Sequence, residues 1–181
     1  MQASKKSYGT HNHMKGQLLS QMLINCHCCL DNLGTQHNQN SIMEMERRSI
    51  TKQTFETCAG TLHEEVMLAT QSDPCLVFWP SLFTEHTIFN EVSEGLGQDF
   101  PNIPQVLLDP PGHGKSCFNG KKLSFGDCAR AVCEILDQLK FNTCIFIGCV
   151  WGGLVGIHFA ATYPTRVMHM VSSNSWLTYT Y

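Results

Sequence analysis

The residues that could do chemistry gather in one strand–turn–helix segment of the second half of the chain. Residues 144–153 read CIFIGCVWGG, so that a short apolar run leads to Gly148 and a second glycine follows at Gly152. This spacing is that of the nucleophile elbow, G-x-S-x-G, in which a strained turn lifts its middle side chain clear of a sheet at the start of a helix. The middle position holds Val150. The segment therefore predicts the turn without its nucleophile, because valine has no lone pair with which to attack.

Other reactive groups near this segment are better interpreted as structural. Cys149 lies one position too early, since an elbow exposes only its middle residue, and we interpret it as a packed thiol. His113 lies in a glycine-rich turn and is interpreted as a loop residue. That turn, residues 112–116, reads GHGKS, but a phosphate-binding P-loop would need glycine where Asp109 stands, and a dinucleotide loop would need glycine at Cys117. We expect no cofactor.

The first fifty residues differ in composition from the rest. They are rich in Gln, Asn, His, Ser and Met and show no period that would bury one face, so we expect a disordered or poorly defined extension over residues 1–50. The weak apolar patch 18–30 lacks the features of a targeting peptide. Its cluster 26–29, CHCC, offers zinc-type ligands, but no second pair follows at the spacing of a zinc module, and we expect no metal.

From about residue 51 the pattern becomes ordered and predicts one domain over residues 51–181. Strand-like and helix-like segments alternate, which favours a parallel sheet with helices on both faces. Ser124 followed by Asp127 is a capping-box-like helix start. The predicted strands are 75–79, 104–108, 143–148 and 167–171, with two weaker ones at 55–59 and 62–68. The predicted helices are 86–97, with Ile88, Phe89, Val92 and Leu96 on its buried face, 124–139 and 152–163.

Composition limits the class of protein. A hydrophobic content of 43% and a net charge of -3 fit a globular protein and give no sign of a nucleic-acid partner. No apolar stretch is long enough to cross a bilayer, so no membrane partner is expected. The ten cysteines are mostly scattered singly, which favours reduced thiols and a cytoplasmic location over a disulfide framework. The oligomeric state is left open.

Three blocks, taken in order, resemble the α/β-hydrolase family over about residues 55–176. Residues 109–116, DPPGHGKS, are similar to the family's D-x-x-G-x-G-x-S loop. Residues 148–153, GCVWGG, are similar to its elbow, and residues 163–167, YPTRV, to its P-x-R-V segment. The resemblance implies an α/β-hydrolase-like parallel sheet flanked by helices. It also implies kinship with serine hydrolases, which cleave ester, amide or related acyl bonds of small molecules.

The departures from the family concern the site. Where the family often has His-Gly after its third strand, this chain has Trp79 and Pro80. The resemblance implies that the backbone N–H groups of Ser81 and Trp151 form the oxyanion hole, beside the substituted nucleophile position at Val150. Both donors are main chain, so side-chain changes leave them intact.

The family's catalytic acid and histidine come later in the chain, and neither has a counterpart here. No Asp or Glu follows Asp137, and the histidines beyond the elbow are His158, on the elbow helix, and His169, inside the last strand. We therefore expect a C-terminally truncated domain with a degenerate site that is inactive as written. The alternative is a non-catalytic hydrolase-fold protein that binds a ligand or partner. A fragment that folds poorly alone is a third interpretation.

Overall fold

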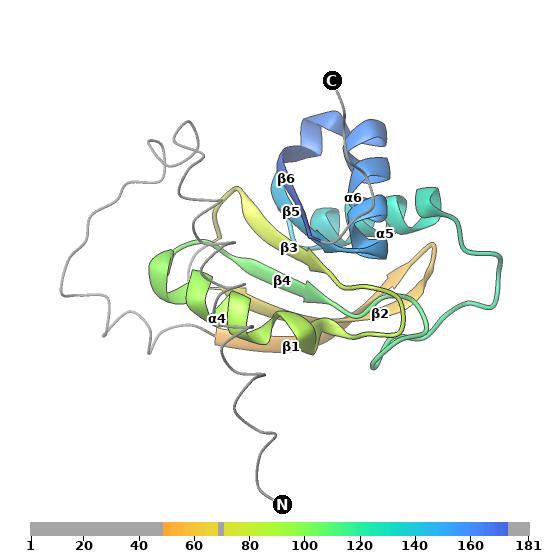
Figure 1. Cartoon of the computed structure of the whole chain (residues 1–181), viewed down its shortest axis with the longest axis horizontal. Helices are drawn as coiled ribbons and strands as arrows, with labels where there is room; N and C mark the ends of the chain where they lie inside the picture. The colour runs from red at the N-terminus through yellow and green to blue at the C-terminus, as the bar shows by residue number, and fades with distance from the viewer. Residues whose placement is uncertain (1–48, 69–70, 174–181) are drawn as a thin grey trace, which may run out of the picture. The chain divides into compact units, whose positions relative to one another are not determined.

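A computed structural model describes residues 49–68 and 71–173 of the chain, and Figure 1 shows their arrangement. The CHCC cluster at 26–29, the apolar patch 18–30 and the predicted disordered extension lie outside these residues, apart from the end of the extension at residues 49–50. The strands are β1 (Ser49–Thr57), β2 (Gly60–Leu68), β3 (Cys75–Trp79), β4 (Gln105–Leu108), β5 (Cys144–Cys149) and β6 (Val167–Ser173). The helices are the 3₁₀ turn η1 (His86–Phe89), α4 (Asn90–Asp99), α5 (Phe125–Gln138), α6 (Trp151–Thr162) and the 3₁₀ turn η2 (Pro164–Arg166).

The strands form one six-stranded sheet in the order β1-β2-β4-β3-β5-β6. The strands β4, β3, β5 and β6 run parallel, as the alternating pattern predicted. The sheet as a whole is mixed, because β1 and β2 form an antiparallel hairpin that joins β4 antiparallel. That hairpin turns at Gly60, whose φ is 128° and whose added Cβ would lie 2.2 Å from the Cys117 carbonyl oxygen. Only glycine fits this turn.

The helices α5 and α6 lie side by side on one face of the sheet (Figure 1). The predicted start of α5 is confirmed: the Ser124 hydroxyl accepts from the Asp127 N–H, and the Asp127 carboxylate accepts from the Ser124 N–H. Such a cap contributes about 1 kcal/mol. Under these helices the core is aromatic in part, for Phe146 of β5 is fully buried and its ring lies 5.9 Å from that of Phe159 on α6. Burying one such side chain stabilises the fold by about 2–3 kcal/mol.

The segment predicted as one helix over residues 86–97 begins differently. Its first four residues form η1, and α4 follows as a separate α-helix that ends at Asp99. The prediction that Ile88 lies on the buried face was wrong, since its side chain is 45% exposed, whereas Phe89 is buried and contacts Phe78 of β3. A 3₁₀ turn has three residues per turn, so the period of 3.6 used for the prediction does not apply there.

The bounds of the remaining strands and helices agree with the predictions within a few residues, apart from the start of β1. This strand begins at Ser49, six residues before the predicted strand 55–59 and two residues before the predicted domain boundary. Along the described chain no helix combines the length and the apolarity needed to cross a bilayer. The architecture is therefore that of an α/β protein whose sheet carries the loops at the carboxyl ends of its parallel strands, where the candidate site lies.

Candidate functional site

The turn between β5 and α6 has the backbone of an elbow. Val150 caps α6 with φ 52° and ψ −104°, and its N–H donates to the Ser173 carbonyl at 2.9 Å. A positive φ is strained for a β-branched residue and costs on the order of 1–3 kcal/mol. The predicted turn geometry is thus present at the predicted position. The side chain at its centre is an alkyl group that cannot attack a substrate.

Close glycine contacts hold this turn against the end of β3. A Cβ added to Gly148 would lie 2.5 Å from the Gly152 carbonyl carbon, so the turn and the helix meet backbone to backbone. A Cβ added to Gly152 would lie 2.1 Å from the Trp79 carbonyl oxygen and 2.8 Å from that of Pro80. The start of α6 is therefore pressed against the chain segment that leads into Ser81.

This packing brings the two implied oxyanion donors into neighbouring backbone segments. Trp151 is the first residue of α6, where a backbone N–H has no acceptor inside the helix. The Ser81 carbonyl, two residues beyond Trp79, accepts from the Thr84 N–H at 3.3 Å and from the Thr84 hydroxyl at 2.8 Å, which folds the loop 80–85 into a turn. Within residues 49–68 and 71–173, neither the Ser81 N–H nor the Trp151 N–H donates to a protein acceptor. That these donors form an oxyanion hole stays a prediction.

The histidines considered in the sequence have partners of their own. The His113 ring nitrogen Nδ1 lies 2.9 Å from the Pro111 carbonyl oxygen, and its ring contacts Phe83 edge-on. His158 projects from α6 and stacks on Phe125 at 5.2 Å. These contacts make both residues structural.

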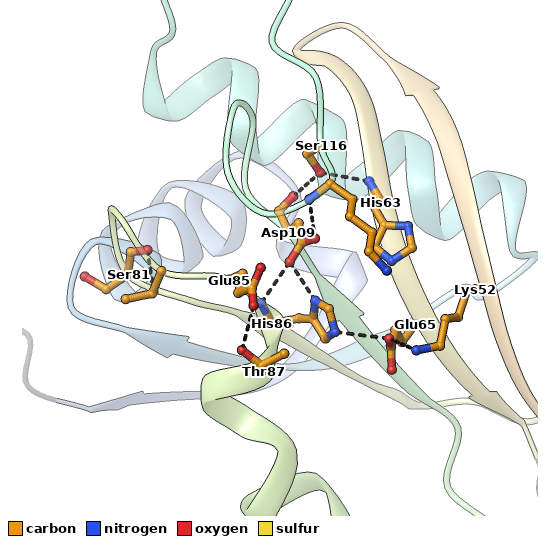
Figure 2. A network of polar contacts seen from close by, with 11 residues as sticks. Lys52, His63, Glu65, Ser81, Glu85, His86, Thr87, Asp109 and Ser116 are labelled. Atoms are coloured by element: carbon orange, nitrogen blue, oxygen red, sulfur yellow. Dashed lines mark hydrogen bonds and ion pairs between the residues drawn. The ribbon is translucent and has the colours of Figure 1, made fainter.

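A buried polar network lies beside the loop 80–85 and was not predicted in full (Figure 2). Asp109, fully buried at the end of β4, accepts through Oδ1 from the His86 N–H at 2.9 Å and lies 2.7 Å from His86 Nδ1. Its Oδ2 accepts from the Lys115 N–H at 3.0 Å. The contact between Asp109 and His86 was not predicted from the sequence.

The network continues from His86 to the solvent. His86 Nε2 lies 3.2 Å from Glu65 Oε1, and the same oxygen accepts from the Lys52 ammonium group on β1. The sequence does not reveal this network, because Glu65 and His86 are far apart along the chain and meet only when β2 pairs with β4. Figure 2 shows the order Asp109, His86, Glu65, Lys52 from the interior outward.

The electrostatic environment favours ionised carboxylates on both sides of the His86 ring, at Asp109 and at Glu65. Burial alone would raise the pKa of Asp109, but the backbone N–H groups of His86 and Lys115 and the His86 ring hold that pKa below its usual range. Burial also works to raise the pKa of Glu65, and here the bond from Lys52 and the charge of His86 outweigh it and lower the pKa. Both groups are therefore hydrogen-bond acceptors at neutral pH.

Ser116 closes the inner side of the network. Its hydroxyl donates to the Asp109 carbonyl at 2.8 Å and accepts from the His63 N–H at 2.8 Å. The buried His63 ring lies 5.9 Å from the His86 ring, and burial lowers its pKa. The D-x-x-G-x-G-x-S loop is thus tied to β2 at its last residue and to η1 at its first.

One further acid is buried without a partner on the opposite face of β2. Glu64 is fully buried, neither of its carboxylate oxygens is hydrogen-bonded to any residue that the structure describes, and burial raises its pKa to about 9. It is register-paired with Leu108 of β4, beyond which lies Trp79, whose indole N–H is also unbonded. Glu64 is a neutral carboxylic acid in an apolar core at pH 7.

The described residues contain no cluster of His, Cys, Asp and Glu that could hold a metal ion. The cysteines among them are free thiols, of which Cys75, Cys128 and Cys144 are buried and Cys117 is exposed. Burial raises the pKa of Cys128 and of Cys144 to about 12.

Known proteins resemble the chain over its ordered part. It is 25% identical over 136 residues to the sn-1-specific diacylglycerol lipase of Xenopus laevis, a match that covers 75% of this chain and 43% of the lipase. It is 30% identical over 91 residues to a poly(3-hydroxyalkanoate) depolymerase of Ectopseudomonas oleovorans, covering 46% of this chain and 32% of that one. The chain thus spans less than half the length of these relatives.

Solved structures give the same fold. An N-acyl homoserine lactonase complexed with N-hexanoyl homoserine matches with a TM-score of 0.60 at 23% identity, covering 70% of this chain and 46% of the lactonase. Epoxide hydrolase A of Mycobacterium thermoresistibile matches with a TM-score of 0.63 at 20% identity, covering 68% and 39%. A family profile described as alpha/beta hydrolase fold matches residues 74–180. The chain belongs to the alpha/beta hydrolase family.

Proposed function

We propose that the chain binds the carboxylate or carbonyl oxygen of a small acyl compound between the N–H groups of Ser81 and Trp151 and does not itself transfer the acyl group. The observation that carries the proposal is the elbow at Val150. Its strained backbone and the glycine contacts around it persist, while the attacking atom is absent.

The ligand class follows from the two donors. Two convergent backbone N–H groups suit one oxygen that bears negative charge or a strong dipole. In an intact serine hydrolase the same pair would hold the oxyanion while a serine attacks and a histidine takes its proton. Relatives of this chain carry names that point to a diacylglycerol and to a poly(3-hydroxyalkanoate), both of which contain carboxylic ester bonds. These names support an acyl compound as the ligand.

The loop that carries Ser81 supplies an apolar neighbour for such a ligand. Leu82 is 40% exposed and Phe83 is 90% exposed, and Phe83 has a strained φ of 61°. An exposed aromatic ring next to a polar donor fits an acyl chain with a few carbon atoms. The same exposed pair also favours a second candidate function, the binding of a protein partner at this loop. We propose a cytoplasmic location, since the described cysteines are free thiols.

The test is a titration of the full chain with sodium hexanoate, followed by amide resonances. We expect the Ser81 and Trp151 amides to shift together and saturably, whereas hexanol, which has the same tail without the anion, leaves them in place. 4-Nitrophenyl hexanoate should be hydrolysed no faster than in buffer. If hexanoate moves neither amide, the proposed binding function is wrong.

A second arm tests the lack of catalysis. Val150→Ser alone should acquire no label from a fluorophosphonate probe, because His113 and His158 are held by other partners. A chimera of Val150→Ser with the C-terminal half of an active relative should label, since it supplies acid and base together. Labelling of the unaltered chain that disappears in Cys149→Ala would instead place the nucleophile at Cys149.

A further inference from the structure

We propose that His86 is a positioning residue for this anion site: held between Asp109 and Glu65, it fixes the loop 80–85 and thereby the Ser81 N–H. This inference rests on the proposed function, because it concerns the Ser81 N–H that would bind the acyl oxygen. The contacts of His86, however, are present in the chain without a ligand.

Two ring contacts hold His86. Its Nδ1 lies 2.7 Å from Asp109 Oδ1 and its Nε2 lies 3.2 Å from Glu65 Oε1. An ionised carboxylate only accepts, so each contact is a hydrogen bond when the ring nitrogen carries the proton. The His86 side chain is buried, at 5% exposure.

The loop 80–85 is held at its two ends. At its start, the carbonyl groups of Trp79 and Pro80 are pressed against Gly152 of α6. At its end, the His86 N–H and ring both contact one oxygen of Asp109. Inside the loop, the Ser81 carbonyl accepts from Thr84, the Phe83 ring contacts His113, and the Glu85 carbonyl accepts from the Ile88 N–H. Releasing the His86 ring from Asp109 would therefore loosen one end of the segment that carries the Ser81 N–H, while the Trp151 N–H stays with its helix.

Two matched substitutions separate the two ring contacts. In His86→Asn the amide nitrogen takes the place of Nδ1 and can still donate to Asp109, whereas in His86→Gln it reaches the place of Nε2 and can donate only to Glu65. We expect His86→Asn to retain most of the hexanoate affinity and His86→Gln to weaken it about tenfold, the effect of one lost charge-assisted hydrogen bond. His158→Asn, on the outer side of α6, serves as the control.

The free protein gives the deciding readout. Hydrogen exchange of the Ser81 amide should be faster in His86→Gln than in the unaltered chain, and it should stay close to the unaltered rate in His86→Asn, which keeps a donor to Asp109. A Ser81 amide with the same chemical shift and the same exchange rate in His86→Gln as in the unaltered chain would overturn the inference. Absence of hexanoate binding would refute the proposed function alone.

Discussion

Glu64→Gln should make the protein more stable at neutral pH, and the gain should grow with pH. Glu64 is fully buried with both oxygens unbonded, and burial raises its pKa from the ordinary 4.5 to about 9. Between these values the folded state holds a proton that the unfolded state has lost. Folding therefore takes up a proton, and stability falls as the pH rises through this window. Glutamine has the shape of the neutral acid and needs no proton.

The magnitude follows from the width of the window. Each pH unit above 4.5 costs the unaltered chain about 1.4 kcal/mol, so that at pH 7 the cost is on the order of 3 kcal/mol. At pH 5 it is below about 1 kcal/mol, and above pH 9 it levels off because the folded state ionises as well. The expected result is a nearly unchanged stability of Glu64→Gln relative to the unaltered chain at pH 5 and a clear gain at pH 8.

Urea unfolding of both proteins at pH 5, 7 and 8 measures this difference. Glu65→Gln is the matched control, one residue away on the opposite face, where the carboxylate bonds Lys52 and faces His86. It should lose stability at neutral pH, because its folded pKa is lowered and the stabilisation is present above the ordinary value. A difference between Glu64→Gln and the unaltered chain that does not vary with pH would show that Glu64 has a partner or is solvated.

Three other substitutions, the first with a matched control, test the packing and charges of the site. Gly152→Ala should lower the free energy of unfolding by about 1–3 kcal/mol in thermal unfolding, because its Cβ would overlap the Trp79 carbonyl oxygen. The control Gly95→Ala, with nothing within 4 Å of the added Cβ, should raise the free energy of unfolding by about 0.5–1 kcal/mol. Equal effects of the two substitutions would contradict the close contact at Gly152. Val150→Gly should raise stability by about 1 kcal/mol by removing the strain at φ 52°, and a loss in calorimetry would show that the valine packing outweighs it. Asp109→Asn should destabilise the chain at pH 7, where the ionised Asp109 stabilises the fold. The difference in stability from the unaltered chain should vanish at acid pH, as the pH falls below the ordinary carboxyl pKa of 3.8 and through the lowered pKa of Asp109. A difference that stays constant down to that pH would argue against a charged Asp109.

The fold could be predicted because its signals are local. The apolar run before Gly148 and the capping pair before α5 each lie within a few residues, and both were placed within one or two positions. The hairpin β1–β2 was placed, but its antiparallel joining to β4 was not, since the pairing of distant strands leaves no mark in either segment. The 3₁₀ turn at residues 86–89 was missed because a helical period was assumed.

The site could be predicted only in its main-chain part. Glycine spacing revealed the elbow, because close backbone approach requires glycine wherever it occurs. The links of Asp109 to His86 and of His86 to Glu65 are contacts between single polar side chains on three separate elements. Such residues are ordinary in any sequence, and only the assembled sheet brings them together. The burial of the acid Glu64 likewise shows only in the assembled sheet.

Val150 explains how the geometry of a catalytic turn can remain when its chemistry has gone. The backbone at this position is imposed by its neighbours: a Cβ on Gly148 or on Gly152 would overlap main-chain atoms, and α6 can begin where it does only if residue 150 takes a positive φ. The strain of valine, on the order of 1–3 kcal/mol, is offset by the packing of α6 on the sheet. Because the implied donors belong to the main chain and the nucleophile to one side chain, the valine at position 150 removes the attacking atom and leaves the backbone N–H groups of Ser81 and Trp151 in the chain. This is what the proposed binding of an acyl oxygen requires.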